Sequence, residues 1–140
     1  MRNAGRSPQH LIHGDCHDGN VLLHDGHVVG FVDLDHLPRG PRIYDLARYL
    51  ANRVLWAVGD FAERGPRFRS LVATPLDGYQ RANALTGRER RAIGAAILMV
   101  EIDNAEWCLG TGDSTSSYVT GSVKAAHWTA DNVASFAIPR

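Results

Sequence analysis

The chain of 140 residues is long enough for one domain with its own hydrophobic core, and it is too short for two ordinary domains. Its 15 basic and 15 acidic residues balance, which argues against nucleic acid or an anionic membrane as a partner. It contains no apolar run of membrane-spanning length and no apolar signal core near residue 1. We therefore expect a single cytoplasmic domain over 1–140, with Cys16 and Cys108 as free thiols.

The first 40 residues predict an irregular lead-in followed by a β-hairpin. Residues 1–10 are largely polar. Two runs rich in β-branched residues, 20–23 and 27–34, are separated by His-Asp-Gly, and an Asp-Gly pair in this position is a strong hairpin signal. The sequence PRGPR at 38–42 then ends the second strand. Residues 11–40 are thus expected to form a polar loop and a hairpin.

Residues 41–140 predict a helical subdomain. Apolar side chains recur at steps of three and four over 43–58, which is typical of one face of an amphipathic helix, and Gly59 follows as a stop. A second helix is expected over about 68–83, with an interruption near Pro75.

A third helix is expected to begin after Thr86, because Glu89 stands three residues further on, the spacing of a capping box. It should end at Gly110. Its expected apolar stripe consists of Ile93, Ile97 or Leu98, Ile102, Ala105 and Leu109. Residues 111–122 predict a loop of small polar residues, and 124–136 predict a final helix. The fold class is therefore α+β and mostly helical.

Oxygen-bearing side chains are concentrated around the hairpin. In LIHGDCHDGNVLL, residues 11–23, Asp15 and Asn20 lie just before the first strand, and Asp33 lies where the second strand ends. Because the turn folds the second strand back on the first, Asn20 and Asp33 become neighbours. Carboxylate and amide oxygens form a hard ligand set that suits Mg²⁺.

The spacing of these residues is that of a phosphate-transferring loop. Protein kinases use H-x-D-x-x-x-x-N, with the Asp near the acceptor hydroxyl and the Asn on a metal, followed by a second metal-binding Asp. Asp15, Asn20 and Asp33 stand at the corresponding positions. Phosphoryl transfer asks little covalent work of a protein, because it depends on an oriented hydroxyl and on neutralised phosphate charge.

Three blocks in order carry a family resemblance. HGDCHDGNVLL, VVGFVDLDHLPRGPR and IYDLARYL, spanning Leu11 to about Leu50, resemble the aminoglycoside phosphotransferase and choline kinase-like superfamily, including its homoserine-kinase-like members. The resemblance implies the C-terminal lobe of a protein-kinase-like fold, in which the small hairpin carries the catalytic loop. It also implies transfer of phosphate from ATP, with Mg²⁺, to a hydroxyl of a small molecule such as an aminoglycoside, choline or a homoserine-like acceptor.

The resemblance also assigns roles within the catalytic centre. Asp15 would be the catalytic base, or would orient the substrate hydroxyl. Asn20 and Asp33 would bind the Mg²⁺ that bridges the ATP phosphates. Asp35 has two alternatives, assisting the metal or being simply solvated.

Three more residues would support the loop. His13 would brace it through packing and hydrogen bonds, and His17 would lie near the phosphates or the loop backbone. Asp45, in the sequence YDLA, would cap its helix and hold the catalytic loop by hydrogen bonds.

A kinase of this class also needs an N-terminal lobe with a loop over the phosphates and a strand lysine. About ten residues precede the catalytic segment, the only lysine is Lys124, and no G-x-G-x-x-G occurs. We therefore expect a truncated lobe with the N-terminal lobe absent, no identified nucleotide-binding residues, and weak or no activity alone. A separate N-terminal lobe or self-association would cover its exposed apolar face.

Two alternatives to a kinase stay open. The chain could be a non-catalytic pseudokinase remnant that binds a partner through the exposed lobe face. His13, Asp15, His17 and His36 could instead form a transition-metal cluster of the hydrolase type.

Other reactive or charged side chains have simpler interpretations. Cys16 is interpreted as a filler in the loop and not as a nucleophile. Glu101, Asp103 and Glu106 either form an acidic wall for a cationic substrate or belong to a solvated helix face, and we favour the solvated face.

Overall fold

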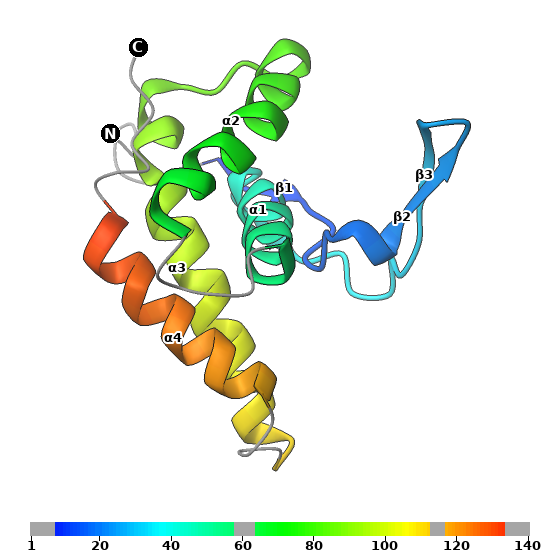
Figure 1. Cartoon of the computed structure of the whole chain (residues 1–140). Coiled ribbons are helices and arrows are strands. Elements are labelled where there is room, and N and C mark those ends of the chain that lie inside the picture. Colours follow the sequence, from blue (N-terminus) through cyan, green and yellow to red (C-terminus); the bar gives the residue numbers. More distant parts are fainter. Residues whose placement is uncertain (1–7, 58–63, 113–116, 134–140) are drawn as a thin grey trace, which may run out of the picture.

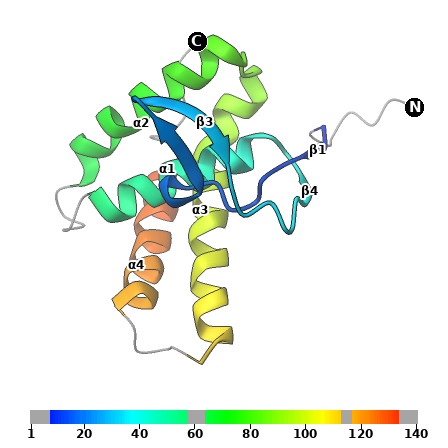
Figure 2. The ribbon, with the colours of Figure 1, turned by 90° about the vertical axis from the view of Figure 1, so that its right-hand side faces the viewer.

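A body of four helices carries a projecting hairpin in the computed structural model, which describes residues 8–57, 64–112 and 117–133 (Figure 1). The helices are α1 (Ile43–Ala57), α2 (Arg64–Ala82), α3 (Gly87–Gly110) and α4 (Ser117–Asn132). Helices α3 and α4 lie side by side in opposite directions, and α1 packs against α3 (Figures 1 and 2). The mostly helical α+β class predicted from the sequence is confirmed. Within the described ranges, no helix is long and apolar enough to cross a membrane.

The hairpin consists of β2 (Val21–His24) and β3 (His27–Phe31), which pair antiparallel with Val21 opposite Phe31. Its two-residue turn has φ of 48° at Asp25 and 76° at Gly26, the positive values that a type I′ turn requires, so the predicted turn is confirmed. The second strand ends at Phe31 and not at residue 34 as predicted. Asp33 has a φ of 61°, outside the β region, so the extended backbone cannot continue through it.

A second pair of strands was not predicted. β1 (His10–Leu11) pairs antiparallel with β4 (Arg39–Gly40), and the Ile12 N–H donates to the Pro38 carbonyl at 3.0 Å. The prediction of an irregular segment through residue 10 is therefore wrong at His10, and PRGPR contains a short strand. The pairing brings both ends of the loop-and-hairpin segment together at the helical body.

Helix α1 begins at Ile43 as predicted, whereas residues 58 and 59 of the predicted end lie outside the described residues. Helix α2 begins at Arg64, earlier than predicted, and continues through Pro75 without the expected interruption. A proline removes one backbone donor from a helix, and here buried Val72 and Leu76 on either side of it pack into the core. Tertiary packing therefore maintains the helix through the proline.

Helix α3 begins as predicted and buries a different face from the predicted one. The Thr86 side chain accepts from the Glu89 N–H at 3.2 Å, and Glu89 accepts from the Thr86 N–H at 2.8 Å, so the capping box is confirmed. The predicted stripe is wrong at Ile102 and Leu109, which are 49% and 56% exposed. The buried face consists of Ile93, Gly94, Ile97, Val100, Glu101, Asn104 and Cys108. Asn104 is buried on this face although it is polar, because Arg48 of α1 donates a hydrogen bond to it.

Helix α4 begins at Ser117, so residues 117–122 of the predicted polar loop are helical. Val119 and Ser122 are buried in this first part. The small Ser122 side chain is fully buried, which allows close packing of the helix, and the sequence pattern did not reveal it. Residues 113–116 and the predicted end at 136 lie outside the described residues.

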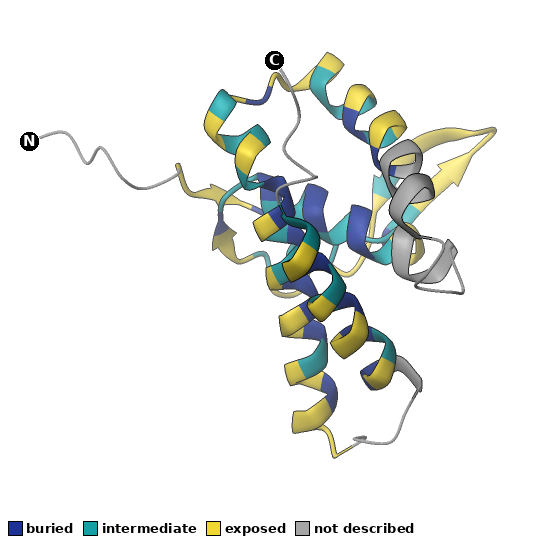
Figure 3. Cartoon of the chain, turned by 60° about the vertical axis from the view of Figure 1, so that its left-hand side comes forward, coloured by how far each residue is buried: buried dark blue, intermediate teal, exposed yellow. Residues whose placement is uncertain are grey.

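The hydrophobic core lies where α1, α2 and α3 meet, and Figure 3 shows the buried residues on their facing sides. It contains Ile43, Leu46, Ala47, Leu50, Ala51, Val72, Leu76, Leu85, Ile93, Ile97 and Val100. The hairpin lies outside this core and is mostly exposed (Figure 3). The polar loop at residues 12–20 therefore joins a packed body to a projecting hairpin.

Candidate active site

Asp45, in the first turn of α1, holds the backbone of the polar loop. Its Oδ2 accepts from the His13 N–H and its Oδ1 from the Gly14 N–H, each at 2.8 Å. Gly14 has a φ of +84°, and a Cβ there would lie 2.9 Å from the Pro38 ring. The loop can adopt this backbone conformation and lie against Pro38 because residue 14 has no side chain. Helix α1 thus fixes the position of the loop backbone.

His13 connects the loop to the end of the hairpin. Its Nδ1 accepts from the Asp15 N–H at 3.3 Å, so its Nε2 is the donor to the Val32 carbonyl at 2.8 Å. The ring also packs edge-on against Phe31, with the two centroids 6.2 Å apart. These contacts brace the loop against the strand that leads to Asp33.

Asp15 is bound by an arginine that the sequence analysis did not single out. Arg48 donates from Nε and Nη2 to the same oxygen, Oδ1 of Asp15, at 3.0 and 2.7 Å. Burial alone would raise the pKa of Asp15, but the hydrogen bonds and charge of Arg48 outweigh burial and hold the pKa below its usual value. Asp15 is therefore an ionised carboxylate at neutral pH.

Asn20 lies at the start of the hairpin with its side chain turned toward Asp15. Its Nδ2 donates to the Asp15 carbonyl at 3.0 Å and approaches Asp15 Oδ2 at 3.4 Å. The Val32 N–H donates to the Asn20 carbonyl at 3.1 Å, and Asp33 is the next residue. Asn20 is buried and Asp33 is exposed. Asp15, Asn20 and Asp33 therefore come to the same end of the hairpin.

His17 contacts Asp15, whereas the side chain of Asp35 forms no hydrogen bond or ion pair with Asp15 or Asn20 within the described residues. His17 Nδ1 accepts from the Gly19 N–H at 3.0 Å at the start of the short 3₁₀ helix η1 (Asp18–Asn20), and its Nε2 lies 3.5 Å from Asp15 Oδ2. Asp35 is exposed, and no hydrogen bond joins its side chain to another residue within the described ranges.

A pocket of about 570 Å³ opens beside the loop. Asp15, Asp33 and Arg48 line one part of it, and Asp103 and Trp107 of α3 line another. Its full lining is His13, Gly14, Asp15, His17, Asp33, His36, Pro38, Tyr44, Arg48, Asn52, Asp103, Asn104 and Trp107. A pocket of this size accommodates a small polar molecule next to the Asp15 carboxylate.

Tyr44 and Asp103 form a hydrogen-bonded pair in this pocket. The Tyr44 hydroxyl donates to Asp103 Oδ2 at 2.7 Å. Burial raises the pKa of Tyr44 to about 12, and its hydrogen bond to the Asp103 carboxylate acts in the same direction. The phenol therefore remains a donor over the physiological pH range.

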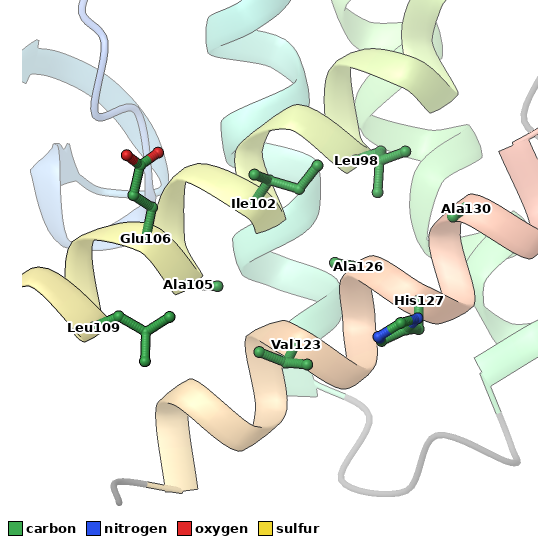
Figure 4. Close-up of a pocket in the computed structure, with 9 residues that line it drawn as sticks. All are labelled: Leu98, Ile102, Ala105, Glu106, Leu109, Val123, Ala126, His127 and Ala130. Carbon is green, nitrogen blue, oxygen red and sulfur yellow. The ribbon is translucent and has the colours of Figure 1, made fainter. Parts of the chain in front are cut away.

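The three acids of α3 do not form one wall or one solvated face. Glu101 is buried, whereas Asp103 is exposed in the pocket beside Tyr44. Glu106 lines a separate apolar groove between α3 and α4, shown in Figure 4. The interpretation as a solvated helix face is therefore wrong at Glu101, whereas Asp103 and Glu106 are exposed as it predicted.

The donor set at the hairpin end fits a magnesium ion by its chemistry. Asp15, Asn20 and Asp33 offer carboxylate and amide oxygens, and the Asp33 carboxylate is not hydrogen-bonded to any other residue within the described ranges. The same part of the chain contains no group of three or more His, Cys, Asp or Glu side chains placed to share a metal. Both ring nitrogens of His13, and Nδ1 of His17, form hydrogen bonds to backbone groups.

The surroundings of Cys16 in the loop make its thiol unreactive. Cys16 is partly buried, and burial raises the pKa of its thiol to about 11, with the carboxylates of Asp45, Asp15 and Asp18 adding to the shift. The thiol stays protonated at neutral pH, in agreement with its interpretation as a filler.

Sequence reasoning missed Arg48 and its second partner, Asn104. Arg48 Nη1 donates to Asn104 Oδ1, which is buried on α3. The spacing of Asp45 and Arg48, three residues apart on a helix, already places them on one face and so offered a signal. The position of Asn104 carried no such signal, because its partner lies 56 residues away.

Comparisons with known proteins identify partial relatives of this chain among bacterial kinases. The stress response kinase A of Salmonella choleraesuis (strain SC-B67) is 41% identical over 69 residues, which cover 49% of this chain and 17% of that protein. The serine/threonine protein kinase RdoA of Salmonella typhimurium has the same identity and coverage. The stress response kinase A of Escherichia coli (strain K12) is 39% identical over 69 residues, again 49% of this chain and 17% of that protein.

The matched segment thus spans about a sixth of the length of these curated relatives. No solved structure matches the chain significantly. The profile of the phosphotransferase enzyme family matches residues 1–93, which contain the loop, the hairpin, α1 and α2. The chain belongs to the phosphotransferase enzyme family.

Proposed function

We propose that this chain carries the catalytic loop of a kinase that transfers phosphate from ATP, with Mg²⁺, to a hydroxyl group. The observation that carries the proposal is the convergence of Asp15, Asn20 and Asp33 at one end of the hairpin, beside a polar pocket. Membership of the phosphotransferase family implies ATP use. Together they favour a kinase over a metal-dependent hydrolase.

In this proposal Asp15 binds the acceptor hydroxyl. Its ionised carboxylate accepts the hydroxyl hydrogen bond and orients the oxygen toward the phosphate, and it takes the proton as transfer proceeds. A low pKa is compatible with this role, because a loose transition state needs orientation more than a strong base. Asn20 and Asp33 would hold Mg²⁺, which would neutralise the phosphate charge.

We also propose that the hairpin and helices form the C-terminal lobe of a kinase-like fold. The apolar side chains of the hairpin are exposed: Leu22, Leu23, Val28, Val29 and Phe31. Soluble proteins rarely leave such a group uncovered. An N-terminal lobe, in the same polypeptide or in another chain, would cover it, and self-association is the alternative.

The acceptor is proposed to be a small hydroxyl compound, such as an aminoglycoside, choline or a homoserine-like molecule. The pocket beside Asp15 has a suitable volume for one, and Asp103 adds a negative charge to its wall. A serine or threonine hydroxyl of a protein is a second candidate, supported by the printed name of the relative RdoA. A small hydroxyl compound and a protein substrate differ in size, and a single phosphate-transfer assay with both acceptors distinguishes them.

The decisive experiment measures Mg²⁺-dependent ATP binding and transfer of labelled γ-phosphate to both acceptor classes. Asp33→Asn should abolish the Mg²⁺-dependent part of ATP binding. Asp15→Asn should retain binding and lower transfer by about 10²–10⁴-fold. Asp25→Asn, at an exposed carboxylate in the turn at the far end of the same hairpin, is the matched control and should change neither.

Two results would count against this proposal. Mg²⁺-ATP binding that is unchanged in Asp33→Asn would remove the metal role and the kinase proposal with it. Intact Mg²⁺-ATP binding without transfer to any acceptor, measured with an N-terminal lobe supplied, would favour the non-catalytic, partner-binding alternative.

A further inference from the structure

Arg48 uses both edges of its guanidinium to join the loop to the helical body. Nε and Nη2 donate to a single oxygen of Asp15, at 3.0 and 2.7 Å, and Nη1 donates to Asn104 of α3. Asn104 is buried and Arg48 itself is largely buried, with 20% of its side chain exposed. Two helices therefore fix the direction from which Arg48 reaches Asp15.

Helix α1 holds the polar loop both by its backbone and by the side chain of Asp15. Asp45 accepts from the backbone of His13 and Gly14, and Arg48, one turn later, binds the side chain of Asp15. The backbone bonds place the loop, but they leave the χ angles of Asp15 free. The guanidinium removes that freedom because both of its donors converge on Oδ1.

The two oxygens of Asp15 are consequently unlike. Oδ1 receives two short charge-assisted bonds, whereas Oδ2 has only longer contacts, with Asn20 Nδ2 at 3.4 Å and His17 Nε2 at 3.5 Å. We propose that Arg48 is a positioning residue that occupies Oδ1 and leaves Oδ2 to receive the acceptor hydroxyl. The catalytic consequence of this contact rests on the proposed kinase function.

Lysine cannot replace this arrangement fully. A guanidinium presents donors in a planar fork, whereas an ammonium presents a point charge on a flexible stem. Lysine would keep the charge near Asp15 but would lose the bridge from Asp15 to Asn104. This difference separates a positional role from a purely electrostatic one.

The kinetic test compares Arg48→Met, Arg48→Lys and Asn104→Ala, with Arg53→Met as the matched control. Arg53 is on the same helix and pairs with Asp18, which is not a lining residue of the pocket. Arg48→Met should lower kcat about 10–100-fold with KM for ATP within about twofold, because misplacing a reacting group mainly costs rate. Arg48→Lys should recover part of the loss, Asn104→Ala should lose less, and Arg53→Met should match the parent.

A double-mutant comparison identifies Asp15 as the group that Arg48 acts on. Arg48→Met should lower the rate no further in an Asp15→Ala background, because its target is gone. Additive losses, or a loss that appears only in KM for ATP, would overturn the inference. Circular dichroism of each variant keeps loss of fold distinct from loss of positioning.

The contact itself can be measured without turnover. In ¹⁵N NMR spectra, the Arg48 Nε–H should exchange slowly with water, and Asp15→Ala should make that exchange at least about tenfold faster. Slow exchange released by Asp15→Ala, in a chain that transfers no phosphate, would uphold the contact and count against the proposed function alone. An Arg48 Nε–H that exchanges equally fast in both proteins would overturn the inference.

Discussion

The helical body and the hairpin use their apolar residues in opposite ways. Leu50, Ile93 and Ile97 are almost completely buried where the helices meet, whereas Leu23 and Val29 of the hairpin are 65% and 63% exposed. The body therefore gains its stability from hydrophobic burial. The hairpin is held by its turn, its backbone ladder and the polar loop that joins it to α1. The candidate active site lies at this junction, so its geometry depends on hydrogen bonds more than on apolar packing.

The largest expected effect concerns the body. Ile97→Ala should lower the free energy of unfolding by about 2–5 kcal/mol, because it leaves a cavity in a packed core. Leu23→Ala, an exposed hairpin residue, should change it by less than about 0.5 kcal/mol. Urea unfolding of both variants measures the contrast. Equal losses would mean that the hairpin is packed in solution and that the two regions do not differ.

The next largest expected loss of stability concerns the contact between Asp45 of α1 and the polar loop. Asp45→Ala removes the acceptor of the His13 and Gly14 N–H groups and should lower stability by about 1–3 kcal/mol. Hydrogen exchange should become faster at these two amides and should stay unchanged in the core of α3. Asp35→Ala is the control at an exposed acid. If the loop amides kept their protection in Asp45→Ala, apolar contacts and not Asp45 would be holding the loop.

Local signals in the sequence predicted the elements that local geometry determines. The Asp25-Gly26 turn needs positive φ at two successive residues, and Thr86 and Glu89 satisfy each other within one helical turn. These features depend on neighbours in the sequence, so they could be derived without knowing the rest of the fold. The end of the hairpin near Asn20 followed from the same turn.

The features that the sequence did not predict depend on contacts between residues far apart in the chain. Ile102 fits the apolar period of α3 and is exposed, whereas Asn104 breaks that period and is buried, because it bonds to Arg48 of α1. Helix α2 continues through Pro75 because residues on both sides of the proline reach the core. The spacing of Asp45 and Arg48 places Arg48 on the helix face toward the loop, but no local pattern reveals that its partner is Asp15, 33 positions away.

A smaller effect tests a charged contact within the body. Arg42 donates two hydrogen bonds to Glu89, at 2.7 and 2.9 Å, and these bonds, together with those from the Thr86 N–H and hydroxyl, lower the pKa of Glu89 from 4.5 to about 2 despite its partial burial. Because the folded-state pKa is lowered, this contact stabilises the protein fully above pH 4.5 and is lost as the pH falls toward 2.

Glu89→Gln should remove this pH dependence, which we expect to be on the order of 1–2 kcal/mol. Urea unfolding of the parent and the variant between pH 5 and pH 2.5 measures it, with Asp77→Asn as an exposed control on α2. If the free energy of unfolding changed with pH in parallel for the parent and Glu89→Gln, ionisation of Glu89 would contribute nothing to stability over this range.

The smallest expected change in stability is the most informative about the hairpin. Replacing Leu23 and Val29 together by serine should alter the free energy of unfolding by less than about 0.5 kcal/mol, because both side chains are already in water. If this surface docks against another lobe or a second copy, the same double variant should weaken that association, which sedimentation measures directly. Ile102→Ser, at an exposed apolar position on α3, is the control and should leave the association unchanged. A loss of stability in the hairpin variant without a change in association would mean that the hairpin packs within its own chain, and the contrast between the two regions would then be wrong.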